Sequence, residues 1–151
     1  MSWDKEINEI LKKKEFALQQ GGKENVERQH SKGLLTIRER ITLILDDNTF
    51  EEIGPGAGGA ERDKNGGLIK FNPANFVLGF GKINGRDCVI GGEDFTVKGG
   101  SPTEAGLRKS IYIEDLAIQN LVPLVRLHQG GGGSVTGASG NTQVSTSPVY
   151  N

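Results

Sequence analysis

The order of elements in the second half of the chain constrains the fold most strongly. Two strand-forming runs, 76–83 and 86–90, flank Asn84-Gly85, the dipeptide that best tolerates the positive φ angles of a type I′ turn. A glycine-rich loop, a helix over 101–119, a strand over 121–127 and a second glycine-rich loop follow. Hairpin, helix and strand in this order predict an α/β layer with at least one crossover connection.

Helix signals are clear at several points. Ser101-Pro102-Thr103-Glu104 places a Ser at the N-cap, a Pro at the first helical position and a Glu at the third, so we expect the helix to begin there. Thr36 and Glu39 form a capping box that opens a second helix, whose apolar stripe must pack on another element. An amphipathic helix is predicted before Gly21-Gly22, and a short exposed helix within 22–33.

These signals divide the chain into four parts. A helical segment over 1–53 precedes a loop over 54–75, whose sequence is turn-forming and offers little to bury. The α/β core covers 76–135, and an irregular tail with almost no apolar periodicity covers 136–151. A strand such as 121–127 needs neighbours on both sides, so we interpret the chain as part of a longer protein.

Composition excludes several classes of protein. The 18 basic and 19 acidic residues leave a net charge of −1, which provides no field for nucleic acid or an anionic membrane. No apolar run approaches the ~20 residues that span a bilayer, and neither a secretory signal nor a transit peptide is visible, which favours a cytoplasmic protein. The single cysteine, Cys88, is interpreted as a packed core thiol, and the two histidines offer no zinc-ligand spacing, so no metal is expected.

The two glycine-rich loops are the candidate chemical features. Lys98-Gly99-Gly100-Ser101 and the run 130–134 each follow a strand, where backbone N–H groups without a neighbouring Cβ could face a developing negative charge. Composition alone favours a flexible linker for 130–134. Glu93-Asp94 could be an acid–base pair, although surface or capping carboxylates are the preferred interpretation, and Arg108 and Lys109 could meet a phosphate or simply face solvent.

Three ordered segments resemble one family. SKGLLTIRERITLILDDNTFEEIG, VLGFGKINGRDCVIGGEDFTVKGGSPTEAGLRKS and LVPLVRLHQGGGGSV are similar to the carboxyltransferase β-type subunits of biotin-dependent acyl-CoA carboxylases, the propionyl-CoA and methylcrotonoyl-CoA type. The similarity covers about residues 15–135. It implies a partial crotonase-like spiral of ββα turns, preceded by N-terminal helices.

The resemblance also implies a reaction and its site. Such subunits move a carboxyl group from carboxybiotin to the α-carbon of a short-chain acyl-CoA, with backbone amides holding the enolate oxygen. Those amides would lie within Gly131, Gly132 and Gly133, and this lowers the weight of the linker interpretation. The residues implied near coenzyme A are Lys98, Gly99, Gly100, Ser101, Arg108 and Lys109.

The implied partners are acyl-CoA, a biotin carboxylase or biotin carrier subunit, and further copies of the full-length chain. Ser134 follows the glycines where propionyl-type relatives carry an Arg, which leaves the acyl group open. Because the family's chains are several times longer, we expect this piece to be inactive alone. The alternatives are a non-catalytic assembly module and a small crotonase-fold acyl-CoA hydratase; a mitochondrial matrix location is the alternative to the cytoplasm.

Overall fold

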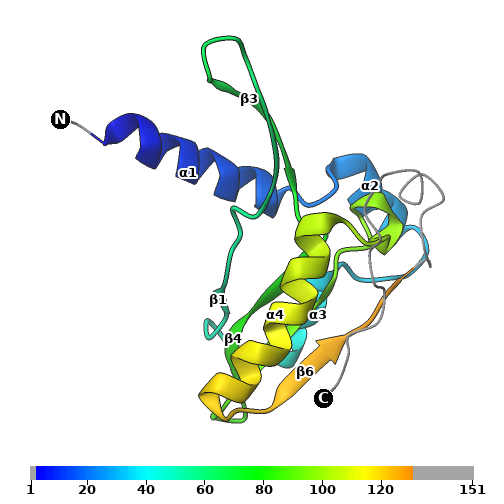
Figure 1. Cartoon of the computed structure of the whole chain (residues 1–151). Helices are drawn as coiled ribbons and strands as arrows, with labels where there is room; N and C mark the ends of the chain where they lie inside the picture. Colours follow the sequence, from blue (N-terminus) through cyan, green and yellow to red (C-terminus); the bar gives the residue numbers. More distant parts are fainter. Residues whose placement is uncertain (1–2, 131–151) are drawn as a thin grey trace.

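The computed structural model describes residues 3–130, which form helices and strands in a mixed α/β arrangement (Figure 1). Three helices come first: α1 (Asp4–Leu18), α2 (Lys23–His30) and α3 (Ile37–Ile44). The strands that follow are β1 (Glu51–Glu52), β2 (Gly58–Arg62), β3 (Leu68–Pro73), β4 (Phe76–Ile83) and β5 (Arg86–Glu93). The short 3₁₀ helix η1 (Lys98–Gly100), helix α4 (Glu104–Asn120) and strand β6 (Leu124–Leu127) complete the order.

The main sheet has the strand order β1-β4-β5-β6. The β4–β5 hairpin is antiparallel, and its turn residues Asn84 and Gly85 have φ angles of 50° and 76°, which confirms the predicted turn. After α4 crosses the sheet, β6 pairs in parallel with β5, with Val89 opposite Leu124. Hairpin, helix and parallel strand make one ββα turn and begin the next, as a crotonase-like spiral requires.

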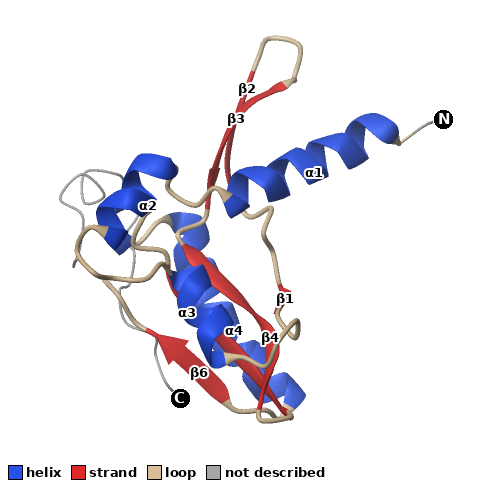
Figure 2. Ribbon diagram, turned by 180° about the vertical axis from the view of Figure 1, so that it is seen from behind, coloured by secondary structure: helices blue, strands red, loops and turns tan. Residues whose placement is uncertain are grey.

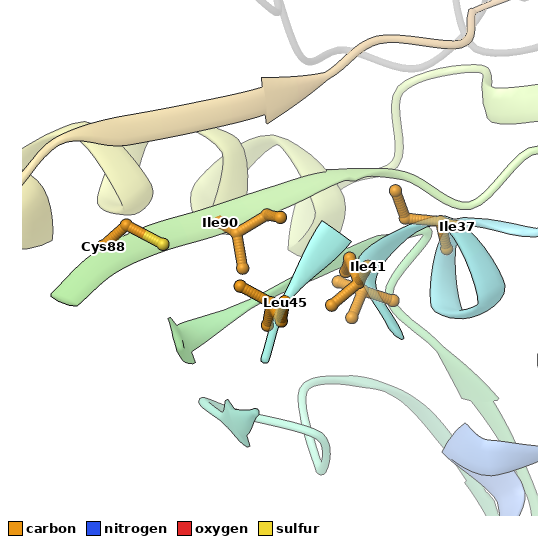
Figure 3. Packing of buried hydrophobic residues seen from close by; sticks show 6 residues of the cluster. Ile37, Ile41, Leu45, Cys88 and Ile90 are labelled. Atoms are coloured by element: carbon orange, nitrogen blue, oxygen red, sulfur yellow. The ribbon is translucent and has the colours of Figure 1, made fainter. Parts of the chain in front are cut away.

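Both faces of the hairpin are covered by helices, and its residues alternate between two apolar clusters. Val77, Cys88 and Ile90 face α3, where Ile37 and Ile41 are each 1% exposed (Figure 3). On the opposite face, Phe76, Leu78 and Val89 pack against Ile113, Leu116 and Ala117 of α4. The apolar stripe predicted for α3 therefore has its partner, and Cys88 is a buried core thiol as expected.

Helix α3 begins where its local signals indicate. The Thr36 hydroxyl accepts a hydrogen bond from the Glu39 N–H, while the Glu39 carboxylate accepts one from the Thr36 N–H, which confirms the capping box of α3. Helix α1 lies beside the β2–β3 hairpin, and both project from the helix-covered sheet (Figures 1 and 2). None of the helices within residues 3–130 has the length and apolar character needed to cross a membrane.

Three local predictions were wrong. Residues 54–75, expected to be a loop, contain the antiparallel pair β2 and β3, whose turn is held by the Asp63 carboxylate accepting from the Asn65 and Gly67 N–H groups. Helix α4 is capped by Thr103 instead of Ser101, because the Thr103 hydroxyl accepts from the Gly106 N–H. The strand predicted over 121–127 begins only at Leu124, and β6 is half-exposed along its length.

Candidate functional site

The first glycine-rich segment lies against Gln129 and Gly130, the residues at which the second one begins. A Cβ atom added to Gly100 would lie 2.7 Å from the Gln129 carbonyl oxygen and 3.4 Å from the Gly130 Cα. Earlier in the chain, a Cβ at Gly92 of β5 would meet the Leu127 carbonyl oxygen of β6 at 2.1 Å. Only glycine at these positions permits so close an approach of the two backbones. The fold therefore brings the first glycine segment to the start of the second, although helix α4 separates them in the sequence.

The first glycine segment has an unusual backbone. Lys98, Gly99 and Gly100 have φ angles of 51°, 61° and 69°, so three successive residues adopt the left-handed region. The Gly100 N–H donates to the Val97 carbonyl and the Ser101 N–H to the Lys98 carbonyl. The amides of Lys98 and Gly99 have no acceptor among residues 3–130. Two of the four amides in this segment are thus not bonded to any group within those residues.

A buried turn fixes the start of this segment. The Asp94 carboxylate accepts from the Thr96 N–H at 3.0 Å and from the Thr96 hydroxyl at 2.5 Å, and burial raises the pKa of Asp94. Thr96 Oγ1 in turn accepts from the Gly21 N–H at 2.8 Å, and a Cβ at Gly21 would lie only 1.9 Å from the Thr96 carbonyl oxygen. The α1–α2 connection is therefore seated directly on the 94–97 turn.

Asn75, which is 2% exposed, fixes the other end. Its amide nitrogen donates to the Ser101 carbonyl oxygen, and its amide oxygen accepts from the Thr103 hydroxyl at 2.7 Å. A Cβ at Gly106 would lie 2.0 Å from the same amide oxygen, so α4 begins in contact with Asn75. These bonds hold Ser101 in an extended conformation outside the helix.

A cleft of about 1220 Å³ opens beside this segment. Its walls come from the α1–α2 connection, the β2–β3 hairpin, the 96–98 turn and the first turns of α4. The volume exceeds the 300–1,000 Å³ typical of sites for drug-sized ligands. The charged residues in its lining are Lys70, Lys98, Glu104, Arg108 and Lys109, so basic groups outnumber acidic ones. The cleft suits a long ligand that carries negative charge.

The two basic residues of α4 differ in their surroundings. Arg108 is exposed and donates to Glu104 Oε1 at 2.6 Å, one turn earlier. Lys109 is only 8% exposed; its Nζ donates to the Gly54 carbonyl oxygen at 3.2 Å, and burial lowers its pKa to about 8. Lys109 thus ties α4 to the connection before β2, while Arg108 can reach a ligand at the mouth of the cleft.

The predicted residues fall into three groups. Lys98, Arg108 and Lys109 line the cleft. Gly99, Gly100 and Ser101 lie outside its lining, and Gly100 faces Gln129. Gly131, Gly132 and Gly133 lie outside the described residues, so their role stays a prediction. Sequence reasoning missed Gly21, Asn75, Thr96 and Gln129; only the Asp94-Phe95-Thr96 spacing, typical of a side chain that binds the backbone two residues on, offered a local signal.

Glu93 and Asp94 do not form an acid–base pair. Asp94 is buried in the Thr96 turn, whereas Glu93 accepts from the Gln129 N–H at 3.2 Å and lies 3.4 Å from His128 Nδ1. The two neighbouring carboxylates therefore belong to different hydrogen-bond systems.

The family described as Carboxyl transferase domain matches residues 28–147 of this chain. The chain is 38% identical over 131 residues to the propionyl-CoA carboxylase beta chain of Cereibacter sphaeroides, covering 85% of this chain and 25% of that one. It is also 38% identical over 136 residues to the mitochondrial propionyl-CoA carboxylase beta chain of Homo sapiens, covering 85% and 24%. The chain thus spans about a quarter of the length of these curated relatives.

Solved structures share the fold. A transcarboxylase 12S structure, described as a hexamer with methylmalonyl-coenzyme A and methylmalonic acid bound, matches with a TM-score of 0.71 and 29% identity, over 89% of this chain and 26% of that chain. A single-chain, multi-domain long-chain acyl-CoA carboxylase matches with a TM-score of 0.71 at 24% identity, over 89% of this chain and 14% of that chain, which supports the fold alone.

Proposed function

Because the chain belongs to the carboxyl transferase domain family, we propose that it forms the acyl-CoA side of a biotin-dependent carboxyltransferase. In this reaction a carboxyl group passes from carboxybiotin to the α-carbon of a short-chain acyl-CoA. The observation that carries the proposal is the basic cleft beside Lys98, whose loop continues directly into the contact between Gly100 and Gln129.

The charges of the cleft fit the phosphate end of a coenzyme A thioester. Lys98 and Arg108 supply cations for the phosphates at one end, and charge-assisted hydrogen bonds to phosphate are about twice as strong as neutral ones. The thioester at the other end would lie beside the uncharged backbone where Gly100 approaches Gln129. Lys109 is buried and bonded to Gly54, so we assign it to shaping the cleft rather than to binding phosphate.

The chemical step rests on backbone dipoles in this proposal. Removing a proton from the α-carbon moves negative charge onto the thioester oxygen, and two N–H groups within Gly131, Gly132 and Gly133 would stabilise that oxygen. A single donor of this kind contributes about 2.7–4 kcal/mol to transition-state stabilisation. Gly99, Gly100 and Ser101 position this region instead of touching the phosphates, because they lie outside the lining of the cleft.

The partners follow from the same proposal. Carboxybiotin would be carried on a biotin carboxylase or biotin carrier subunit, and the full-length protein would associate with further copies of itself. Exposed apolar side chains in the first half of α1, Ile7, Ile10 and Leu11, and Trp3 just before it, support association through that helix. A cytoplasmic location stays a prediction; the human relative is named mitochondrial.

Calorimetric titration of the chain with propionyl-CoA tests the proposal. We expect saturable binding that Lys98→Gln and Arg108→Gln each weaken about five- to tenfold, because each removes a cation from the cleft. The matched control Lys5→Gln removes the same charge from the exposed start of α1 and should leave the affinity unchanged. The proposal fails if no binding occurs, or if all three variants bind as the wild type does.

A further inference from the structure

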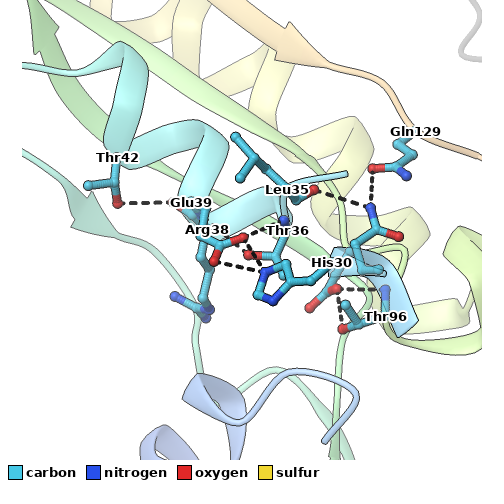
Figure 4. A network of polar contacts seen from close by, with 10 residues as sticks. His30, Leu35, Thr36, Arg38, Glu39, Thr42, Thr96 and Gln129 are labelled. Carbon is cyan, nitrogen blue, oxygen red and sulfur yellow. Dashed lines mark hydrogen bonds and ion pairs between the residues drawn. The ribbon is translucent and has the colours of Figure 1, made fainter. Parts of the chain in front are cut away.

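Gln129, the last residue with a side chain before the glycine run, is contacted from three directions. Its N–H donates to Glu93 Oε2 at 3.2 Å. Its side-chain oxygen accepts from Gln29 Nε2 at 3.0 Å, a bond that spans 100 residues of sequence (Figure 4). Its carbonyl group packs against Gly100, where an added Cβ would lie 2.7 Å away. Backbone and side chain are thus both held.

The groups that hold Gln129 are themselves fixed. Gln29 is 3% exposed, and its Nε2 also donates to the Leu35 carbonyl oxygen at 3.1 Å, which joins α2 to the segment before α3 (Figure 4). Glu93 lies 3.9 Å from Arg126 Nη2, and Arg126 donates to Glu114 at 2.8 Å. An anchored donor and an anchored acceptor leave Gln129 little freedom, since hydrogen-bond strength depends steeply on distance and angle.

The residues that follow Gln129 in the sequence are glycines, and glycine has more backbone freedom than any other residue. Gln129 therefore fixes the point from which the chain enters the run. At this position the chain has Gln129, tied to three elements that are distant in sequence: α2, the end of β5 and η1.

We infer that Gln129 is a positioning residue, clamped by Glu93, Gln29 and Gly100, that fixes the start of the glycine run beside the first glycine segment. The inference rests on the proposed function, in which amides of that run face the thioester enolate oxygen. A displacement of the run by about 1 Å can cost a factor of about 100 in a reaction that depends on positioning. The clamp connects the helical N-terminal segment to the reaction centre.

Amide hydrogen exchange measured by NMR on the complete 151-residue chain tests the clamp. Glu93→Ala removes the acceptor for the Gln129 N–H, so exchange at Gln129 should rise at least tenfold while exchange at Leu78 and Val89 in the core strands is unchanged. Glu93→Gln retains a side-chain oxygen and should restore exchange to within about threefold of the wild type. Glu61→Ala on the exposed β2 strand is the control and should have no effect.

Gln129→Ala gives a second, milder perturbation, because it removes the bond to Gln29 and leaves the backbone bond to Glu93 in place. We expect faster exchange at Gln129 and Gly130 only. Unchanged exchange at Gln129 in Glu93→Ala, or a uniform rise that includes Leu78, would overturn the clamp, since the second result indicates global destabilisation.

Ligand binding separates the clamp from the proposed function. The probes are propionyl-CoA and a coenzyme A analogue that carries a negative charge where the enolate oxygen would lie. Loss of the clamp should reduce the ratio of their affinities about tenfold in Glu93→Ala, with recovery in Glu93→Gln. An unchanged ratio despite faster exchange contradicts the positioning role. If the wild type binds neither probe while exchange responds as expected, the clamp stands and the proposed function fails.

Discussion

Replacement of Lys109 by Met should stabilise the protein at neutral pH, and its effect should disappear in alkali. Lys109 is 8% exposed and makes one hydrogen bond, from Nζ to the Gly54 carbonyl oxygen. Burial of the ammonium group lowers its pKa from 10.5 to about 8, with Glu52 opposing and Arg38 reinforcing that change. Such a difference between the unfolded and folded pKa corresponds to about 3 kcal/mol of unfavourable free energy.

The sign of the pH dependence follows from proton binding. Between pH 8 and 10.5 the unfolded chain holds a proton on Lys109 that the folded protein has lost, so the free energy of unfolding rises with pH in this window. Below pH 8 the cost of burying the charge is present in full. Met keeps the apolar stem of the side chain and removes the charge, although the Gly54 carbonyl loses its donor at a cost of about 1 kcal/mol.

Urea unfolding at pH 7 and pH 10 measures this effect. At pH 7 we expect Lys109→Met to be more stable than the wild type by about 2 kcal/mol, and by pH 10 the advantage should fall by roughly 2–3 kcal/mol. Cys88, whose pKa is raised by burial, is common to both proteins, so its titration cancels in the comparison. A difference in stability that stays constant from pH 7 to pH 10 would refute the reasoning.

Three further predictions concern packing. Gly21→Ala should lower the free energy of unfolding in urea by about 2–3 kcal/mol, because its Cβ would lie 1.9 Å from the Thr96 carbonyl oxygen. The control Gly59→Ala has open space around it and should stay within about 0.5 kcal/mol of the wild type. Equal losses of stability would contradict the contact between the α1–α2 connection and the 94–97 turn. Gly99→Ala and Gly100→Ala both place a side chain at positive φ, but only the Gly100→Ala side chain meets Gln129. The Gly100→Ala protein should therefore be at least about 1 kcal/mol less stable than the Gly99→Ala protein. The reverse order would show that Gly100 and Gln129 do not touch. Cys88, 3% exposed, should react with iodoacetamide at least about 100-fold more slowly in the native than in the urea-unfolded protein, and fast labelling of the native protein would rule out its core position.

The elements governed by local rules could be predicted from the sequence. The β4–β5 turn depends on the two residues Asn84 and Gly85 alone, and the capping box of α3 depends on Thr36 and Glu39, which are three residues apart. The β2–β3 hairpin carried a comparable signal, Asn65-Gly66 with Asp63 before it, which was outweighed by the glycine-rich composition around it.

The remaining features depend on contacts between distant residues. Ser101 and Thr103 are both good N-caps, and the choice of Thr103 is made by Asn75, which binds the Ser101 carbonyl and the Thr103 hydroxyl from 26 and 28 residues away. Gly21 was interpreted as the end of a helix, because nothing near it in sequence reveals its contact with Thr96, 75 residues later. The run 130–134 was a candidate from the sequence itself, whereas the assignment of the oxyanion role to Gly131, Gly132 and Gly133 follows from the resemblance.

An experimental structure of the chain with bound propionyl-CoA tests the central claim most directly. We predict that the coenzyme lies in the cleft between the α1–α2 connection, the β2–β3 hairpin and the start of α4, with its phosphates near Lys98 and Arg108. Its thioester should lie where Gly100 meets Gln129 and Gly130. Coenzyme A bound on another face, or a thioester directed away from both glycine segments, would contradict the account.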